Sequence, residues 1–362
     1  MEEVVTTNTR PLVDAFWQGK RVLVTGHTGF KGGWLVTWLK QMGAAVTGIA
    51  LPADTKPSLF ELAQVADGID SHFCDIRKAE DVNRIVRGAQ PEIVMHLAAQ
   101  PLVRASYRDP VATFACNVMG TVHLLDALRN LDSVRVALMV TTDKVYRNAE
   151  QPFPYREDDV LGGHDPYSAS KAASEFVIAS YRDAFLKTQG VAIASARAGN
   201  VMGGGDWSED RLIPDAVRAW QSGHPLNIRR PQSIRPWQHV LEPLHGYLAL
   251  AQKLWRQPEL AGPFNFGPNS HEAATVRDVI ELARKAYGRG DVQYDNCNSG
   301  PHETGCLTLE IAKSRAILGL KPRWDLSKTV NQTMAWYCAM QNQGFDAGEM
   351  CRTQIAAYTD GL

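Results

Sequence analysis

The chain has few of the features that mark membrane, secreted or nucleic-acid-binding proteins. It contains no apolar run of about 18 residues, the length that a membrane-spanning helix needs. Its N-terminal stretch, MEEVVTTNTRPLVDAFWQGK, opens with acidic residues and lacks a hydrophobic segment, so we expect no secretory signal. The net charge is −1, which gives no overall field to attract nucleic acid or a membrane surface. We therefore expect a cytoplasmic protein that binds neither.

Cysteine is also scarce, with six residues in 362 and no CxxC pair. This usage is typical of reduced thiols in a cytoplasm. Cys297, His302 and Cys306 lie close together in the sequence, but no fourth ligand follows at a usual spacing. We therefore predict no metal site. Internal repeats and low-complexity tracts are absent as well.

What the chain does contain is a regular alternation of strand and helix patterns. We expect residues 1–16 to form a flexible arm and residues 17–200 to alternate between buried strands and amphipathic helices. That order predicts an α/β fold in which a doubly wound parallel sheet is covered on both faces. Gly, Pro and Arg become frequent after residue 200, and the helices shorten. Residues 201–362 are therefore expected to form a smaller, mixed α/β lobe that binds the substrate.

A glycine-rich stretch, RVLVTGHTGFKGGWL over residues 21–35, joins the first strand to the first helix. Gly26, Gly29 and Gly32 are spaced by three, and side chains there would block the close approach of a diphosphate to backbone amides. The alternative is an ordinary tight turn. The position between strand and helix favours a Rossmann-like dinucleotide site. A triphosphatase loop is excluded because Lys31 is followed by Gly32 rather than Ser or Thr.

The sequence leaves the choice between NAD and NADP open. The acid or arginine that usually decides it stands at the end of the second strand. Here that end reads GIALPAD, and Asp54 comes several residues late. The absence of an arginine at this place favours NAD. Asp75, after the third strand, is expected either to bind the adenine amine or to lie in a surface turn, and His27 either to crowd the diphosphate or to bond to it.

The chemistry is indicated by residues further along. Thr142 follows a predicted strand, and Tyr167 and Lys171 are four residues apart, which places them on one helix face. A lysine ammonium lowers the pKa of a neighbouring phenol, so this pair predicts a phenolate base near neutral pH. A surface pair of the same spacing is the alternative. The glycine loop upstream favours the catalytic interpretation.

With these motifs the chain resembles the extended short-chain dehydrogenase/reductase superfamily, in its nucleotide-sugar branch. The stretches HLAAQPLVRASY, NVMGT, TTDKVYRN, DPYSASK, RAGNVMGGGDWSEDRLIPD and RPWQHVLEPLHGYL extend the likeness from about Phe16 to about Trp324. They are most similar to the CDP-glucose 4,6-dehydratases. The resemblance implies a lyase that uses NAD, acts on CDP-glucose and supplies deoxysugars for polysaccharide synthesis.

The resemblance also implies roles for single residues. Tyr167, set by Lys171 and Thr142, would take the proton of the sugar 4-hydroxyl while hydride leaves carbon 4. Asp143 would be the acid for loss of the 6-hydroxyl, and Lys144 the base for the carbon 5 proton. An ordinary lysine has a pKa of about 10.4, so Lys144 must be desolvated or lie near another cation. The alternative is that Lys144 orients Asp143 and another group takes the proton.

Two sets of residues are expected to bind ligands. The cofactor residues, beside Tyr167 and Lys171, are Gly26, Thr28, Gly29, Phe30, Lys31, Gly32, Asp75, Ile76, Leu97, Ala98, Ala99 and Thr141. The substrate residues are Gln100, Arg104, Asn200, Arg211, Arg235 and His239. Arg229 and Arg230 are interpreted equally well as diphosphate ligands or as solvated charges.

Rival functions are an epimerase, a dehydratase for a dTDP-, GDP- or UDP-sugar, and a cofactor-binding sensor without activity. The Asp143–Lys144 pair argues against an epimerase, and the presence of Tyr167 and Lys171 argues against a sensor. The residues alone do not distinguish the nucleotide base. The resemblance further implies a homodimer or homotetramer that pairs through the long helices near residues 104–130 and 167–187.

Overall fold

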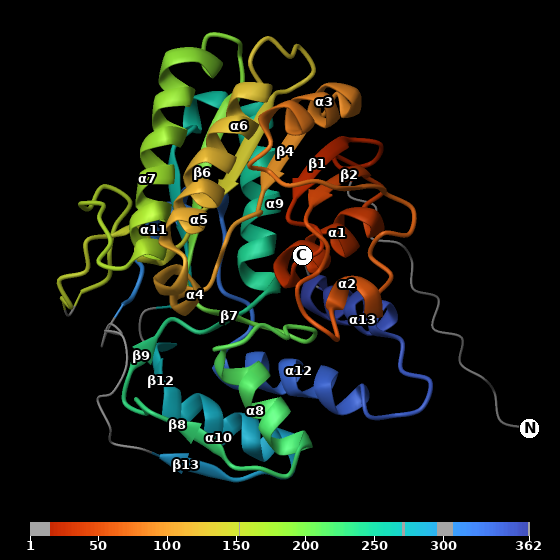
Figure 1. The fold of residues 1–362 in the computed structure, drawn as a ribbon, viewed down its shortest axis with the longest axis vertical. Helices are drawn as coiled ribbons and strands as arrows, with labels where there is room; N and C mark the ends of the chain where they lie inside the picture. The colour runs from red at the N-terminus through yellow and green to blue at the C-terminus, as the bar shows by residue number, and fades with distance from the viewer. Residues whose placement is uncertain (1–14, 152, 270–271, 295–306, 361–362) are drawn as a thin grey trace, which may run out of the picture.

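The structure is a computed structural model that describes residues 15–151, 153–269, 272–294 and 307–360 (Figure 1). Almost all of the predicted arm lies outside these residues, as do Cys297, His302 and Cys306. Within the described part, no cluster of three or more potential ligand side chains could hold a metal ion. None of the helices in these ranges combines the length and apolar character that a bilayer crossing requires.

A seven-stranded sheet forms the centre of the first part, in the order β11-β6-β5-β4-β1-β2-β3. All six pairings are parallel. The strands are β1 (Arg21–Thr25), β2 (Ala45–Ala50), β3 (Asp70–Phe73), β4 (Ile93–His96), β5 (Val136–Val140), β6 (Ala192–Ala198) and β11 (Pro263–Phe266). The strand order reverses between β1 and β4, and ligands of such sheets bind outside the carboxyl ends at that point. The predicted doubly wound, Rossmann-like sheet is confirmed.

Helices cover both faces of the sheet. Val22 and Val24 of β1 belong to the core on one face, with α1 and α9, whereas Leu23 belongs to the core on the other, with α3, α6 and α7. Period-two alternation of buried apolar residues therefore supplies both layers. The helical segments of this part are α1 (Phe30–Gln41), α2 (Leu59–Leu62), α3 (Ala79–Ala89), α4 (Val103–Arg108), α5 (Pro110–Phe114), η1 (Ala115–Met119), α6 (Gly120–Ala127), η2 (Asp143–Val145), α7 (Pro166–Tyr181), η3 (Arg182–Leu186), α9 (Leu241–Arg256), η4 (Pro258–Leu260) and α11 (Ala312–Leu318).

The second part lies below the sheet in Figure 1, around α8, α10 and α12. Its elements are β7 (Val201–Met202), α8 (Leu212–Gln221), β8 (Leu226–Ile228), β9 (Ile234–Arg235), β10 (Gln238–His239), β12 (Ala274–Thr275), α10 (Val276–Tyr287), β13 (Val292–Tyr294) and α12 (Leu326–Ala339). The last helix, α13 (Ala347–Thr359), packs against α1. The chain passes from the first part to the second after β6. It returns to the first part at α9 and β11, so the two parts alternate along the sequence.

Candidate active site

The glycine loop after β1 has a backbone that side chains would not fit. Gly26 has a φ of +80°, and a Cβ on Gly32 would lie 2.0 Å from the Gly26 carbonyl oxygen. Gly29 is the N-cap of α1 and offers no side-chain cap to its first amides. Those amides are therefore available to an anion at the positive end of the helix. The loop thus fits a diphosphate, as its spacing predicts.

One large pocket lies at the carboxyl ends of the sheet strands and is also lined by loops of the second part. Of the predicted site residues, His239 alone is missing from its lining. The lining includes, from the cofactor set, Gly26, Thr28, Gly29, Phe30, Lys31, Gly32, Asp75, Ile76, Leu97, Ala98, Ala99 and Thr141. It also includes Thr142, Asp143, Lys144, Tyr167, Lys171, Gln100, Arg104, Asn200, Arg211 and Arg235.

Two histidines lie elsewhere than expected. His239 is fully buried, with its ring against Trp34 and Trp324, and burial lowers its pKa to about 3. It is a neutral core residue rather than a substrate ligand, and the prediction for it is corrected. His27 is also fully buried, and its Nε2 is 2.7 Å from the Ser71 hydroxyl. It is absent from the pocket lining, so the structure supports neither of the two expectations for it.

Asp75 borders the pocket and is already paired. Its carboxylate accepts hydrogen bonds from the backbone and the guanidinium of Arg77, which also lines the pocket. The side-chain hydrogen bonds from Arg77 hold the pKa of Asp75 below its usual value. Arg77 was not among the predicted site residues, because its place in the sequence does not distinguish it from an ordinary surface arginine.

The catalytic candidates come from two neighbouring elements. Thr142 caps the short helix η2, which carries Asp143 and Lys144 directly after β5. Asp165 caps α7, whose first turn holds Tyr167, and Lys171 follows one turn later. The Lys171 ammonium donates a hydrogen bond to the Val140 carbonyl at 3.0 Å. Two well-defined caps therefore bring these side chains together.

The electrostatics of Tyr167 differ from the prediction. Burial raises the pKa of Tyr167 to about 12, although a side-chain hydrogen bond with Thr142 and the charge of Arg211 act in the opposite direction. Burial also lowers the pKa of Lys171 to about 8. Desolvation is the largest effect on both groups, so the protein alone holds a protonated phenol.

Asp143 has one satisfied and one unsatisfied oxygen. Its Oδ1 accepts a hydrogen bond from the Thr142 hydroxyl at 2.9 Å, whereas its buried Oδ2 has no partner among the described residues. Burial raises the pKa of Asp143 above its usual value. A carboxyl group in such surroundings is suited to carry and donate a proton.

The predicted substrate residues are held in different ways. Arg104 pairs with Asp210 at 2.9 Å, and Arg211 pairs with Asp206 at 3.2 Å. The Gln100 amide is engaged within the fold, because it donates to the Thr113 hydroxyl and accepts from the Leu102 amide. Arg229 and Arg230 also line the pocket, which favours their interpretation as ligands over solvated charges.

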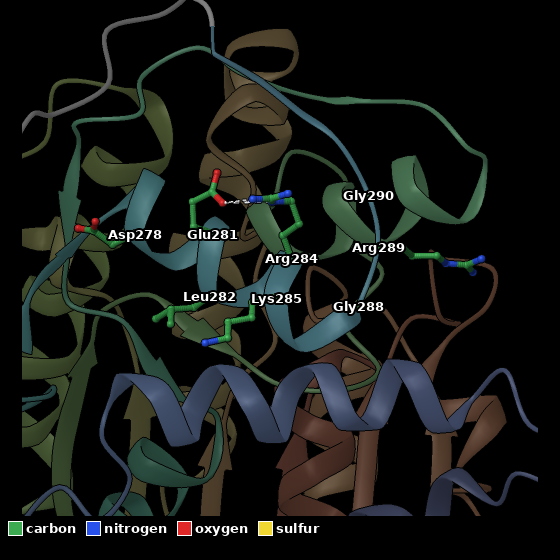
Figure 2. A pocket seen from close by; sticks show the side chains of 8 residues that line it. All are labelled: Asp278, Glu281, Leu282, Arg284, Lys285, Gly288, Arg289 and Gly290. Atoms are coloured by element: carbon green, nitrogen blue, oxygen red, sulfur yellow. Dashed lines mark hydrogen bonds and ion pairs between the residues drawn. The ribbon is translucent and has the colours of Figure 1, made fainter.

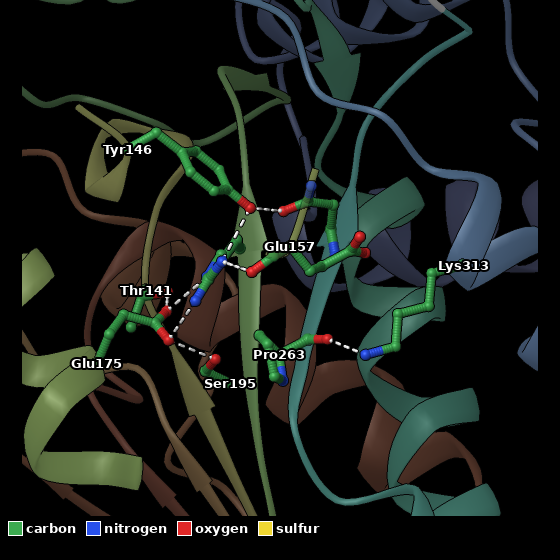
Figure 3. Close-up of polar contacts among 9 residues, drawn as sticks. Thr141, Tyr146, Glu157, Glu175, Ser195, Pro263 and Lys313 are labelled. Carbon is green, nitrogen blue, oxygen red and sulfur yellow. Dashed lines mark hydrogen bonds and ion pairs between the residues drawn. The ribbon is translucent and has the colours of Figure 1, made fainter. Parts of the chain in front are cut away.

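A buried ion pair joins α7 to β6 next to the catalytic segment, where it contacts Thr141 and Tyr146 (Figure 3). Arg197 of β6 donates two hydrogen bonds to Glu175 of α7, and both side chains are only 4% exposed. Glu175 also accepts from the Thr141 hydroxyl, and Arg197 donates to Tyr146. Thr141 and Tyr146 flank the catalytic segment, so the ion pair ties both of its ends to the sheet. The sequence gives no sign of this pairing.

A second hollow runs along α10 and contains none of the predicted site residues. Figure 2 shows Glu281 and Arg284 paired with each other on this helix. The hollow offers charged surface side chains and no group of the catalytic set.

The sequence was compared with models of known protein families, and one of them matches most of the chain. The family model described as GDP-mannose 4,6 dehydratase matches residues 23–333. The chain belongs to this family of nucleotide-sugar dehydratases.

Individual relatives agree with the family. The chain is 46% identical to a CDP-glucose 4,6-dehydratase of Salmonella typhimurium over 330 residues, which cover 90% of this chain and 92% of that protein. It is 28% identical to a dTDP-glucose 4,6-dehydratase of Xanthomonas campestris over 338 residues, or 88% and 93% of the two chains. A Thermus thermophilus UDP-glucose 4-epimerase solved in complex with NAD shares the fold, with a TM-score of 0.75 and 25% identity over 87% of this chain and 98% of that one.

Proposed function

We propose that this chain is an NAD-dependent CDP-glucose 4,6-dehydratase, a lyase that converts CDP-D-glucose to CDP-4-dehydro-6-deoxy-D-glucose. The observation that carries the proposal is the meeting of Asp143 and Lys144 with Tyr167 and Lys171 in one pocket. It occurs in a chain that is 46% identical to a CDP-glucose 4,6-dehydratase. An epimerase needs the tyrosine and lysine but has no use for an acid aimed at carbon 6.

The cofactor is NAD, and the residues present fit it. The loop at Gly26, Gly29 and Gly32 offers backbone amides to the diphosphate, and a Cβ at Gly32 would displace that backbone. Asp75 lies at the far end of the pocket from Tyr167 along the sheet, where it serves the adenosine half. When bound, NAD supplies a positively charged ring that accepts the hydride of carbon 4 and later returns it to carbon 6.

Oxidation at carbon 4 needs a base. Tyr167 takes the proton of the 4-hydroxyl, and its hydrogen bond with Thr142 and the charge of Arg211 favour its ionised form. Lys171 stands one turn away and is fixed to the Val140 carbonyl. Its pKa of about 8 leaves it mostly protonated at neutral pH, so it adds a positive charge beside the phenol.

Elimination then needs a base and an acid on the new ketone. Lys144 removes the proton of carbon 5, which the neighbouring carbonyl has made acidic. Asp143 donates its proton to the departing 6-hydroxyl, which leaves as water. The unpartnered Oδ2 and the raised pKa of Asp143 support this assignment. Lys144 gives its proton back to carbon 5 as carbon 6 regains the hydride, so carbon 4 stays a ketone. The proton that Tyr167 took from the 4-hydroxyl passes on to restore Asp143 for the next turnover.

The second part of the molecule holds the nucleotide. Arg211 precedes α8 in the sequence, Arg235 follows it, and both line the pocket. The fork of a guanidinium group matches the oxygens of a diphosphate. Arg104 and Asn200 border the same space from the sheet. We assign these four residues to the substrate, and Gln100 to the support of the loop that follows β4.

The working unit is a homodimer or homotetramer. Large apolar side chains stay exposed along α5, α7 and the helical segments that continue them, including Val111, Phe114, Met119, Phe176 and Phe185. Helices α5 and α7 pack against each other, and these exposed residues lie on them and on their continuations. An apolar surface of this kind marks a protein interface.

The four cysteines of the described residues are free thiols, in keeping with a cytoplasmic enzyme.

The proposal is tested with a panel of nucleotide sugars. The purified protein is incubated with NAD and CDP-glucose, dTDP-glucose, UDP-glucose or GDP-mannose, and the 4-keto product is measured by its absorbance in alkali. Product from CDP-glucose alone, or far faster than from the others, is expected. Product from dTDP-glucose but not from CDP-glucose would assign the chain to the sister activity.

A further inference from the structure

His96 is a buried titratable residue that no step of the proposed mechanism uses. It ends β4, and residues 97–99, which follow it, line the pocket. Each of its ring nitrogens faces a threonine hydroxyl. Nδ1 is 2.7 Å from the hydroxyl of Thr25 at the end of β1, and Nε2 is 3.2 Å from the hydroxyl of Thr121 in α6. The ring therefore joins two elements that lie on either side of β4.

The surroundings of Thr25 fix the direction of the first of these hydrogen bonds. The Thr25 hydroxyl oxygen accepts hydrogen bonds from the amides of Leu97 and Ala98, each at 3.1 Å. The Leu97 amide is shared with the Thr25 carbonyl. A hydroxyl has two acceptor positions and one proton, so this proton goes to the remaining partner, His96. Nδ1 is then the unprotonated nitrogen of the ring.

The surroundings of Thr121 lead to the same assignment independently. Its hydroxyl lies 2.7 Å from the Asn117 carbonyl, which can only accept a hydrogen bond. The Thr121 proton is therefore used there, and the Thr121 oxygen accepts from Nε2 of His96. Both ends assign one neutral tautomer, with its proton on Nε2. Burial and the charge of Lys171 lower the pKa of His96 to about 3, so the ring stays neutral at pH 7.

The hydrogen bonds continue from Asn117 into the catalytic helix. The Asn117 side-chain amide donates to the Ser170 hydroxyl at 2.8 Å, and Ser170 donates to the Tyr167 carbonyl at 2.7 Å. Ser174, one turn further along α7, donates to the Asn117 carbonyl at 2.8 Å. Tyr167 and Lys171 lie on the turns of α7 that these bonds hold.

The other end of the chain of hydrogen bonds lies at the glycine loop. Thr25 directly precedes Gly26, and a Cβ on Gly26 would lie 2.8 Å from the Ala98 nitrogen. The missing side chain thus lets the loop pack against the amide that Thr25 holds. A continuous set of hydrogen bonds therefore connects the proposed diphosphate site with the helix that carries the phenol and the ammonium.

We propose that His96, fixed as the tautomer with its proton on Nε2, is a positioning residue that holds the glycine loop and the catalytic helix at their correct separation. The kinetic part of the inference rests on the proposed function, whereas the tautomer does not. The loop binds one end of the cofactor and the helix carries the base, so a change in their separation misaligns the reacting groups. A displacement of about 1 Å can lower a rate by about 100-fold.

The tautomer is tested by ¹⁵N NMR of the full-length protein labelled at histidine. The His96 signals are those lost in His96→Gln. If that variant does not fold, Thr121→Val identifies them by their shift, because it removes the acceptor of Nε2. We expect an unprotonated Nδ1 and a protonated Nε2. A proton on Nδ1, alone or together with one on Nε2, would overturn the inference.

The positioning role is tested by kinetics at saturating NAD. His96→Phe keeps a ring and removes both nitrogens, so kcat should fall about 10–100-fold. The KM for CDP-glucose should not change, because the chain of hydrogen bonds contains none of the residues assigned to the substrate. His96→Gln, which restores a donor near the place of Nε2, should recover part of kcat. His72→Phe, at a partly exposed histidine of β3, is the matched control and should keep the wild-type kcat.

The outcomes separate the inference from the function. Folded His96→Phe with the kcat of the wild type, or with a lower melting temperature alone, would make His96 an ordinary core residue and overturn the positioning role. A wild type that does not act on CDP-glucose would contradict the proposed function instead, and the NMR spectrum would still decide the tautomer.

Discussion

The two oxygens of the Asp143 carboxyl have different surroundings. One is fixed by Thr142, and the other is buried without a partner among the described residues. Burial keeps the group protonated to a higher pH than an exposed aspartate. A side chain held in this way can give up its proton only to a group that enters the pocket.

Asp143→Asn should therefore separate the two halves of the reaction. The amide has no acidic proton, so we expect oxidation at carbon 4 to continue while turnover falls by about 10²–10⁴. Mixing the variant with NAD and CDP-glucose should leave bound NADH, seen by its absorbance. Asp126→Asn, at a surface pair with Arg129, is the control and should keep full turnover. Normal turnover in Asp143→Asn would remove the acid role.

The charge of Lys31 should also make the stability of the protein depend on pH. The pKa of about 7 in the fold lies below the ordinary lysine value of 10.5, so the unfolded chain binds more protons between these two pH values. The contribution of this group to the free energy of unfolding thus rises with pH from about 7 upward. We expect Lys31→Met to raise the melting temperature more at pH 6.5 than at pH 9. Equal gains at both values would show that the lysine is not desolvated.

Among the elements, the loop between β1 and α1 offers a matched pair of substitutions. A Cβ on Gly32 would meet backbone at 2.0 Å, whereas a Cβ on Gly29 would meet only the Gly26 carbonyl oxygen at 3.4 Å. Gly32→Ala should lower the free energy of unfolding by about 1–3 kcal/mol, as overpacking does. Gly29→Ala should melt normally but bind NAD more weakly. Denaturant unfolding and calorimetry measure the two effects, and equal stability of both variants would contradict the geometry.

The ion pair between α7 and β6 tests how the catalytic segment is held. Glu175→Gln or Arg197→Met alone leaves a buried charge without its partner and should cost about 3–5 kcal/mol of unfolding free energy. The double variant should cost less than the sum, because it leaves no unpaired charge. Urea unfolding of the four proteins gives the coupling. Strict additivity would mean that the two side chains act independently.

The elements differ in how far the sequence predicts them. The strands of β1, β4 and β5 are runs of Val, Ile, Leu and Met, and local apolar pattern is sufficient for them. β11 is four residues between glycines and prolines, and its place beside β6 depends on contacts distant in sequence. The same limit explains His239. Its neighbours in the sequence suggest a pocket, whereas Trp34 and Trp324, which bury it, come from both ends of the chain.

For the molecule as a whole, the exposed apolar surface on α5 and α7 predicts the assembly. Val111 is 78% exposed and Phe176 is 64% exposed. Val111→Asp with Phe176→Asp should break the proposed homo-oligomer at this surface, because a charge in an apolar interface is costly to bury. Light scattering after size exclusion measures the mass. Val160→Asp, in an exposed loop, is the control, and a monomeric wild type would contradict the proposed interface.

The central claim is that this pocket lends a hydride to NAD and takes it back while water leaves the sugar. Its most direct test is one incubation of the protein with CDP-glucose and a small amount of NAD, in which the 4-keto sugar and NADH are measured together. We predict product in large excess over NAD, with no accumulation of NADH. NADH that rises in step with the product, or CDP-glucose left unchanged, would contradict the account.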